Sequence, residues 1–242
     1  MNTRTLELAT AHGPMALYET RPDGAARGAV IVIQEAFGVN DHIEDVARRF
    51  ADAGYHAVAP HLFHRAGGGT APYDDFSKVI PLYERLDDDG ILADLDAARE
   101  HLHQAGWTDS QIGIVGFCFG GRVTFLAALR RPLGAAVGFY GGGIVTQRFP
   151  QFPALVDEAA MLQSPWLGMF GEDDQTIPVE DVDQLRNALQ QASVATDVVL
   201  YPECGHAFHN DQRQDVYRDG EAKDAWNRTL GWFDRHLAAS RT

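Results

Sequence analysis

The side chain best suited to chemistry in this sequence is a cysteine in a glycine-rich turn. The segment 116–121 reads Gly-Phe-Cys-Phe-Gly-Gly and lies between an apolar run at 112–117 and an amphipathic run at 120–130. A tight turn from strand to helix exposes its central residue and needs glycine at 116 and 120, because the flanking backbones approach too closely for a Cβ. The positive end of the following helix favours a thiolate at Cys118. An isolated cysteine is more often a small buried apolar residue, but this frame predicts a nucleophile.

A nucleophile of this kind needs a base and an acid that orients the base, in the chain order nucleophile, acid, histidine. The segment 171–178, Gly-Glu-Asp-Asp-Gln-Thr-Ile-Pro, follows an apolar run at 166–170. Its carboxylates are therefore expected at the carboxyl edge of a sheet, where crevice sites form. We predict that Asp174 is the acid, while Glu172 and Asp173 are loop charges or helix caps. Capping of a helix that begins near 179 is the alternative role for Asp174.

The predicted base is His206, which follows an apolar run at 197–201 and a turn. His209, three residues later, is the nearest alternative, and His61 and His64 could line a pocket. These paired histidines lack the i, i+4 spacing of a helical metal site, so no metal site is predicted. Cys204 is expected to pack in the turn, and with only two cysteines in the chain the thiols are expected to be free.

Short β-rich runs alternate with longer amphipathic runs, a pattern typical of a mostly parallel sheet with helices on both faces. We expect a hairpin at 6–20 and strands at 29–33, 56–60, 112–117, 135–140, 166–170 and 197–201. We expect helices at 42–53, 91–105, 120–130, 179–192 and 221–238. Residues 62–90 break this rhythm and are predicted to form a lid or pocket wall. The whole chain, 1–242, is expected to form one α/β domain.

The charge of the chain excludes several classes of partner. With 34 acidic and 20 basic residues the formal net charge is −14, which disfavours nucleic acids and anionic membrane surfaces. The N-terminal residues lack a basic stretch followed by an apolar run, and no long apolar window occurs. We therefore expect a cytoplasmic protein whose partner is a small molecule.

Taken together, these segments resemble the dienelactone hydrolase family, also called carboxymethylenebutenolidase. The resemblance extends over nearly the whole chain and includes residues 34–40 (Gln-Glu-Ala-Phe-Gly-Val-Asn), Gly54-Tyr55, Ala59-Pro60, 116–121, Tyr140-Gly141, 174–178 and 205–208. It implies a single-domain α/β-hydrolase fold and a hydrolase that cleaves esters or lactones without a cofactor. It also implies a triad of Cys118, Asp174 and His206, in agreement with the assignment from strand ends.

The resemblance adds residues that spacing alone does not select. It implies that Glu35 controls the ionisation of the thiol and that the backbone N–H groups of Ala36 and Phe119 form an oxyanion hole. It also places Tyr140 and Asn210 among the substrate-binding residues. Alternatives are a general carboxylesterase or thioesterase of the same fold and, from another class, a thiol redox or binding protein.

The chain departs from the family's pattern at Asn210. Family enzymes specialised for dienelactone hold its carboxylate with arginines, one of them four residues after the catalytic histidine. Asparagine carries no charge and cannot form the guanidinium fork, so we expect weaker binding of anionic substrates. Residues 62–90 offer Arg65, Lys78 and Arg85 as substitutes.

Overall fold

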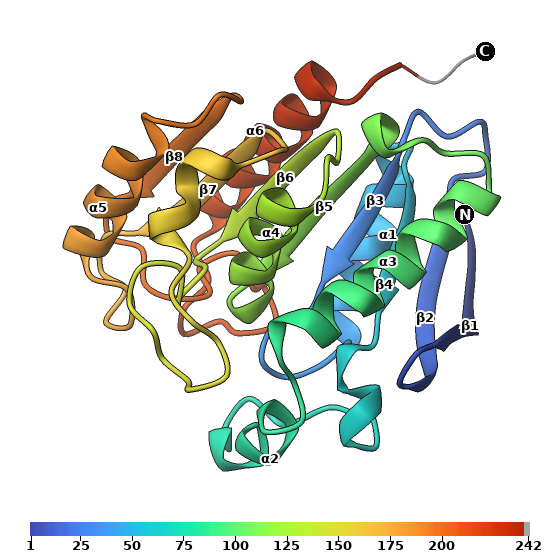
Figure 1. The fold of residues 1–242 in the computed structure, drawn as a ribbon, viewed down its shortest axis with the longest axis horizontal. Coiled ribbons are helices and arrows are strands. Elements are labelled where there is room, and N and C mark those ends of the chain that lie inside the picture. The colour runs from blue at the N-terminus through green and yellow to red at the C-terminus, as the bar shows by residue number, and fades with distance from the viewer. Residues whose placement is uncertain (240–242) are drawn as a thin grey trace.

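The computed structural model describes residues 1–239, which form one sheet with helices packed on both of its faces (Figure 1). The strand order is β1-β2-β4-β3-β5-β6-β7-β8. The strands are β1 Asn2–Thr10, β2 Gly13–Arg21, β3 Ala29–Ile33, β4 His56–Pro60, β5 Ile112–Phe117, β6 Ala135–Phe139, β7 Trp166–Gly171 and β8 Thr196–Tyr201. β1 and β2 pair antiparallel, as do β2 and β4, whereas all pairs from β4 to β8 are parallel. The mostly parallel α/β fold expected from the sequence is confirmed.

The helices divide between the two faces of the sheet. They are α1 Asp41–Asp52, α2 Ile80–Tyr83, α3 Asp88–Gln104, α4 Phe119–Arg130, α5 Val179–Leu189 and α6 Asp219–His236. Figure 1 shows α3 and α4 in front of the sheet and α1 and α6 behind it. Behind the sheet Phe50 of α1 contacts Phe233 of α6, with ring centroids 5.9 Å apart. Among the described residues, no helix combines the length and the apolar character that a membrane span requires.

The central strands are apolar because both faces of the sheet are covered. Every residue of β3, β4, β5 and β6 is buried. The strand expected at 135–140 ends one residue early, because Tyr140 adopts a left-handed φ of 38° and leaves the ladder. The helix expected at 91–105 begins earlier, since Asp87 caps it by accepting a hydrogen bond of 2.6 Å from the N–H of Gly90.

The helix expected at 179–192 ends at Leu189. The N–H groups of residues 190–192 each bond a carbonyl three residues earlier, which tightens the chain out of the α-helix. Residues 62–90 contain two short 3₁₀ helices, Leu62–Ala66 and Phe76–Lys78, in addition to α2. These short elements carry no sustained period, which is why the sequence indicated only an excursion.

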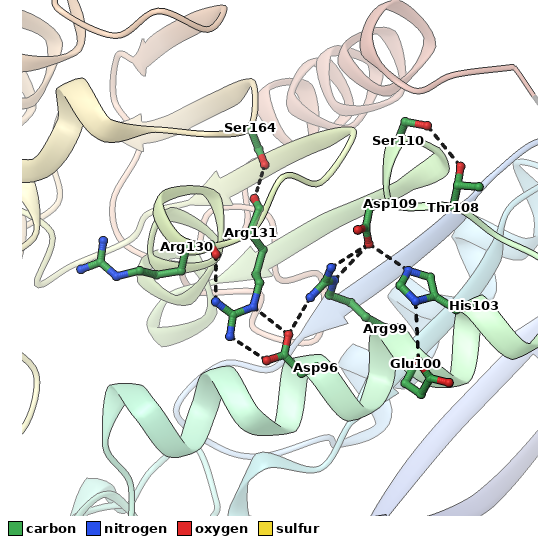
Figure 2. Close-up of polar contacts among 10 residues, drawn as sticks. All are labelled: Asp96, Arg99, Glu100, His103, Thr108, Asp109, Ser110, Arg130, Arg131 and Ser164. Carbon is green, nitrogen blue, oxygen red and sulfur yellow. Dashed lines mark hydrogen bonds and ion pairs between the residues drawn. The ribbon is translucent and has the colours of Figure 1, made fainter.

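The C-terminal end of α4 is fixed to α3 by charged side chains (Figure 2). Arg131 donates to both carboxylate oxygens of Asp96, at 2.7 and 2.6 Å. Arg99 on α3 bonds the same aspartate at 2.6 Å and Asp109 at 2.8 Å. A bidentate guanidinium–carboxylate contact fixes orientation as well as distance. The helix that begins beside Cys118 is therefore held at its far end.

Candidate active site

The turn between β5 and α4 places Cys118 at the carboxyl edge of the sheet. Cys118 precedes the first residue of α4 and adopts a φ of 55°, a conformation that non-glycine residues rarely accept. A Cβ at Gly116 would collide with the carbonyl of Gly120, and one at Gly120 would lie 2.6 Å from the carbonyl oxygen of Gln34. The glycines are thus required by close backbone approach, as the sequence predicted.

His206 and Asp174 come together from the loops that follow β8 and β7. The Nδ1 atom of His206 lies 2.6 Å from Oδ2 of Asp174. The other oxygen of Asp174 accepts hydrogen bonds from the N–H and the hydroxyl of Thr176, at 2.8 and 2.7 Å. Burial raises the pKa of Asp174, but its bonds to His206 and Thr176 outweigh this and hold it below the usual value. The neighbouring acids Glu172 and Asp173 are exposed.

The imidazole of His206 lies between this carboxylate and the thiol of Cys118. Burial lowers the pKa of His206, but Cys118 and Asp174 on its two sides outweigh burial and raise it to about 10. An imidazole whose pKa is raised in this way readily accepts a proton, and the nearest donor is the thiol of Cys118. The structure thus brings together the three residues that the sequence selected.

A cavity of about 280 Å³ opens beside Cys118 and His206. Aromatic side chains form a large part of its wall, which suits a planar or apolar substrate group. The aromatic lining residues are Phe37, Phe76, Tyr83, Phe119, Phe149 and Phe152. Phe76 and Tyr83 belong to residues 62–90, so this segment contributes to the wall of the cavity.

Ala36 and Phe119 line the cavity together with Cys118. Phe119 is the first residue of α4, so its N–H has no acceptor within the helix. Ala36 lies in the loop after β3, whose carboxyl end is adjacent to that of β5. Two N–H groups placed in this way could bind a developing oxyanion.

Glu35 and Asn210 lie behind the cavity wall rather than in it. Both are buried, at 1% and 0% exposure, and the Nδ2 of Asn210 donates to Oε2 of Glu35 at 3.0 Å. Tyr140 is also fully buried, and its hydroxyl has no partner among the described residues. Burial, Glu35 and Cys118 raise the pKa of Tyr140, which places both groups near its hydroxyl.

Three arginines line the cavity that sequence reasoning did not select: Arg122, Arg148 and Arg213. The substitutes considered from the sequence, Arg65, Lys78 and Arg85, are not among the lining residues. Arg65 instead pairs with the buried Asp94 at 2.7 Å. Of the three, only Arg122 had a sequence signal for a place near the cavity, because it lies one helical turn after Cys118. The other two lie in irregular loops that no periodicity locates.

Arg122 uses most of its donors within the protein. It is 2% exposed and donates to both oxygens of Asp88, at 2.7 and 2.9 Å. It also donates to the carbonyls of Gly143 and Pro153, at 3.3 and 2.7 Å. Arg122 therefore joins the nucleophile helix to the start of α3 and to the loop 143–153.

The alternative histidines occupy other environments. His209 is buried, stacks on Phe117 with ring centroids 5.3 Å apart, and has its pKa lowered by burial to about 3. His64 bonds Asp94 at 3.0 Å, and the buried Nε2 of His61 has no partner among residues 1–239. None of these three lines the cavity beside Cys118.

Within residues 1–239 one cluster has ligand atoms close enough for a metal ion: Glu19, His56 and His101. The Nδ1 of His56 accepts a hydrogen bond of 3.0 Å from Trp107, so its proton is on Nε2, directed at Glu19. Arg4 and Arg21 bind the same carboxylate. Two cations beside Glu19 and a protonated Nε2 suit an ion-pair cluster, not a metal site.

The chain is similar to known proteins over most of its length. The family model described as "Dienelactone hydrolase family" matches residues 15–237. A protein of Salmonella typhimurium with the provisional name carboxymethylenebutenolidase is 41% identical over 228 residues, covering 92% of this chain and 83% of its own. A similarly named protein of Methylorubrum extorquens is 39% identical over 232 residues, covering 94% and 79%. A crystal structure from Klebsiella pneumoniae, provisionally named a dienelactone hydrolase, has a TM-score of 0.87 at 37% identity and covers 96% of this chain and 98% of its own.

Proposed function

Because the chain belongs to the dienelactone hydrolase family, we propose that it cleaves its ester or lactone bonds with Cys118 as nucleophile, His206 as base and Asp174 as orienting acid. The observation that carries this proposal is the position of His206, which binds Asp174 through Nδ1 at 2.6 Å and lies beside Cys118. This is the arrangement of a nucleophile, a base and a group that fixes the orientation of the base.

The reaction begins when the proton of the Cys118 thiol passes to His206 and the thiolate attacks the substrate carbonyl. Asp174 stabilises the imidazolium, and its bonds to Thr176 keep the carboxylate ionised. Glu35 is assigned the control of thiol ionisation that the family resemblance implies. Its burial and its position near Tyr140, which Cys118 also influences, support this role.

Negative charge then develops on the carbonyl oxygen. The N–H groups of Phe119 and Ala36 donate to it, and one donor of this kind stabilises a transition state by about 3 kcal/mol in measured enzymes. Collapse of the adduct breaks the bond to the leaving oxygen, which takes the proton from His206. The acyl group remains on Cys118 as a thioester.

Water completes the cycle. His206, again neutral, takes a proton from a water molecule that attacks the thioester. The products are the free acid and the thiol, and for a lactone the acid and the alcohol are parts of one molecule. The aromatic lining of the cavity favours small esters or lactones with a planar or apolar group.

Hydrolysis of 4-nitrophenyl acetate before and after blocking with iodoacetamide tests this function. We expect turnover by the intact protein and loss of turnover in proportion to the alkylation of Cys118. Cys204 is fully buried, so the reagent is expected to select Cys118. Full activity in protein alkylated at Cys118 would contradict a cysteine nucleophile. Alkylation without any ester turnover would favour a thiol redox or binding protein.

A further inference from the structure

Glu35 is a buried carboxylate without a cation. It is 1% exposed, and within residues 1–239 no Lys, Arg or His nitrogen lies within ion-pair distance of it. A buried carboxylate is costly unless hydrogen bonds replace its solvation. Its hydrogen-bond donors are therefore neutral groups.

The first neutral donor is Asn210, whose amide orientation is fixed by its neighbours. Its Oδ1 accepts a hydrogen bond of 3.1 Å from the N–H of Gln212. The Nδ2 atom therefore faces the site, where its two hydrogens go to Oε2 of Glu35 and to the hydroxyl of Tyr73, both at 3.0 Å. Every hydrogen-bonding group of this amide has a partner.

The hydroxyl of Tyr73 has one proton to give, and Glu35 is beside it. The phenolic oxygen accepts from Asn210 and, at 2.9 Å, from Nδ2 of Asn40. Two bonds occupy its acceptor capacity and leave its own proton to donate. Burial and the Glu35 carboxylate raise the pKa of Tyr73 to about 12, so the hydroxyl retains that proton at neutral pH.

Residues 69–73 hold Tyr73 against the loop that carries Glu35. The N–H of Ala71 donates to the carbonyl of Phe37 at 3.0 Å. The rings of Tyr73 and Phe37 meet edge to face with centroids 4.7 Å apart. Gly38, at φ 88°, approaches so closely that a Cβ there would lie 2.8 Å from the carbonyl oxygen of Gly69. The middle of the 62–90 segment is thus docked on the loop after β3.

We propose that Tyr73 is a positioning residue that, with Asn210, holds the Glu35 carboxylate by neutral hydrogen bonds and so sets its influence on the thiol of Cys118. The proposal rests on the proposed function, because it deepens the role of Glu35 there. Residues 62–90 would then both form part of the cavity wall and position Glu35. Displacement of residues 69–73 removes a donor from Glu35 and alters the reactivity of the nucleophile.

The test follows the thiolate directly and does not require turnover. The rate of Cys118 alkylation by iodoacetamide is measured against pH in the wild-type protein, Tyr73→Phe, Glu35→Gln and the double variant, and peptide mass spectrometry identifies the labelled residue. Phenylalanine keeps the ring contact with Phe37 and removes only the hydroxyl. Tyr18→Phe is the matched control, because its buried hydroxyl bonds Arg48, outside this cluster.

A negative charge beside the thiol opposes ionisation of the thiol, so Glu35→Gln is expected to move the midpoint of the alkylation profile to lower pH. A hydrogen bond to a carboxylate favours its charged form, so the loss of the Tyr73 donor weakens the negative charge that Glu35 presents to the site. Tyr73→Phe is thus expected to move the midpoint in the same direction by about half a pH unit or more. The double variant is expected to match Glu35→Gln, and Tyr18→Phe to match wild type.

An unchanged midpoint in Tyr73→Phe, with its melting temperature retained, would overturn the proposal. An equal shift in the wild-type and Glu35→Gln backgrounds would do the same, because Tyr73 would then act without Glu35. Hydrolysis of 4-nitrophenyl acetate by the same variants reports separately on the proposed function. A protein that shows the coupled shift but no hydrolysis would support the role of Tyr73 and contradict the esterase.

Discussion

The carboxylate of Asp174 offers one oxygen to Nδ1 of His206, at 2.6 Å, and the other to Thr176. The first bond places the Nδ1 proton between His206 and the acid. Nε2 is then the ring nitrogen available for the thiol. The acid therefore determines which ring nitrogen of the imidazole exchanges a proton with the thiol.

Asp174→Asn is expected to lower kcat strongly with little effect on folding. The amide can present its NH₂ group to Nδ1, which stabilises the wrong tautomer of His206. In triads of this type the corresponding change lowers kcat by about 10⁴-fold. Steady-state kinetics with 4-nitrophenyl acetate measure the loss, and a thermal melt checks the fold. A variant with more than about a tenth of wild-type kcat would remove Asp174 from the triad.

Cys118→Ala is expected to abolish ester turnover and to leave the melting temperature nearly unchanged. The substitution removes one sulfur atom from a partly exposed position beside the cavity, so little packing is lost. Kinetics and calorimetry on the same preparation make the comparison. A parallel loss of activity and stability would indicate a structural cysteine.

The two neighbouring histidines are expected to respond in opposite ways. His206→Ala is expected to eliminate turnover and to retain stability. His209→Ala is expected to retain the catalytic groups but to lose about 3 kcal/mol of stability, because His209 packs between Phe117, Phe139 and Trp226. Urea unfolding and ester kinetics on both variants separate these effects. An inactive His209→Ala beside an active His206→Ala would reverse the assignment of the base.

Stability is expected to fall between pH 6.5 and 5 because His209 is buried in its neutral form. Its pKa is lowered to about 3 in the folded protein, whereas a histidine in an unfolded chain titrates near 6.5. The unfolded chain therefore binds a proton that the folded chain does not, and stability decreases by about 2 kcal/mol per such histidine over this window. His206, whose pKa is raised, is already protonated in the folded protein throughout this window, so it adds only a small slope of the opposite sign as the unfolded chain completes its protonation.

Urea unfolding at pH 6.5 and at pH 5 measures this loss. His209→Phe keeps an aromatic ring in the cluster and removes the titrating group. The variant is expected to lose about 2 kcal/mol less than wild type over the same interval. Equal losses would mean that His209 does not titrate on unfolding, and would assign the slope to other histidines such as His42, whose pKa burial also lowers.

The arginines at the cavity lead to a prediction about substrate charge. Arg148 has no ion-pair partner among residues 1–239, and the nearest carboxylate to Arg213 belongs to the exposed Asp215, at 3.9 Å. Guanidinium groups without a close carboxylate partner beside an apolar cavity attract an anionic substrate group. This prediction opposes the expectation, drawn from Asn210, that anions bind weakly, and kinetics decide between the two. The sequence argument examined residues 62–90, whereas these cations come from loops 141–155 and 205–218.

The comparison uses two esters with the same leaving group. Mono-4-nitrophenyl glutarate carries a carboxylate, and its methyl ester is neutral. In the variant with both Arg148→Gln and Arg213→Gln, the ratio of kcat/KM for the acid to that for the methyl ester is expected to fall by about tenfold or more. Arg186→Gln, on the exposed face of α5, serves as the control. An unchanged ratio would show that neither arginine binds the substrate.

The predicted triad and the residues missed by the sequence differ in what positions them. Cys118, Asp174 and His206 each follow a strand, and parallel strands bring their carboxyl ends to one edge. Sequence position therefore predicts proximity. Tyr73 reaches the site through a segment without periodicity, and its location depends on the docking of Ala71 on Phe37. Contacts of this kind have no local signal in the sequence.

The strand and helix boundaries also separate into those with a local sequence signal and those set by tertiary contacts. The core strands were recognisable because both faces are buried and the residues are continuously apolar. The predicted start of α3 was three residues too late, because the acidic run 87–89 is typical of a loop. In the structure Asp87 caps the helix, and Asp88 and Asp89 belong to its first turn. The left-handed turn at Tyr140 depends on tertiary packing that overrides strand propensity.

The guanidinium of Arg122 joins the start of α3 and the loop 143–153 to the helix that begins beside the nucleophile. A single residue therefore holds together two parts of the cavity surroundings, the start of α3 and the loop 143–153. The three reacting groups are encoded elsewhere in the gene. A substitution at this position is therefore expected to alter which substrates fit, while Cys118, Asp174 and His206 are unchanged. Related enzymes with the same reaction can therefore evolve different substrate ranges through a single substitution at Arg122.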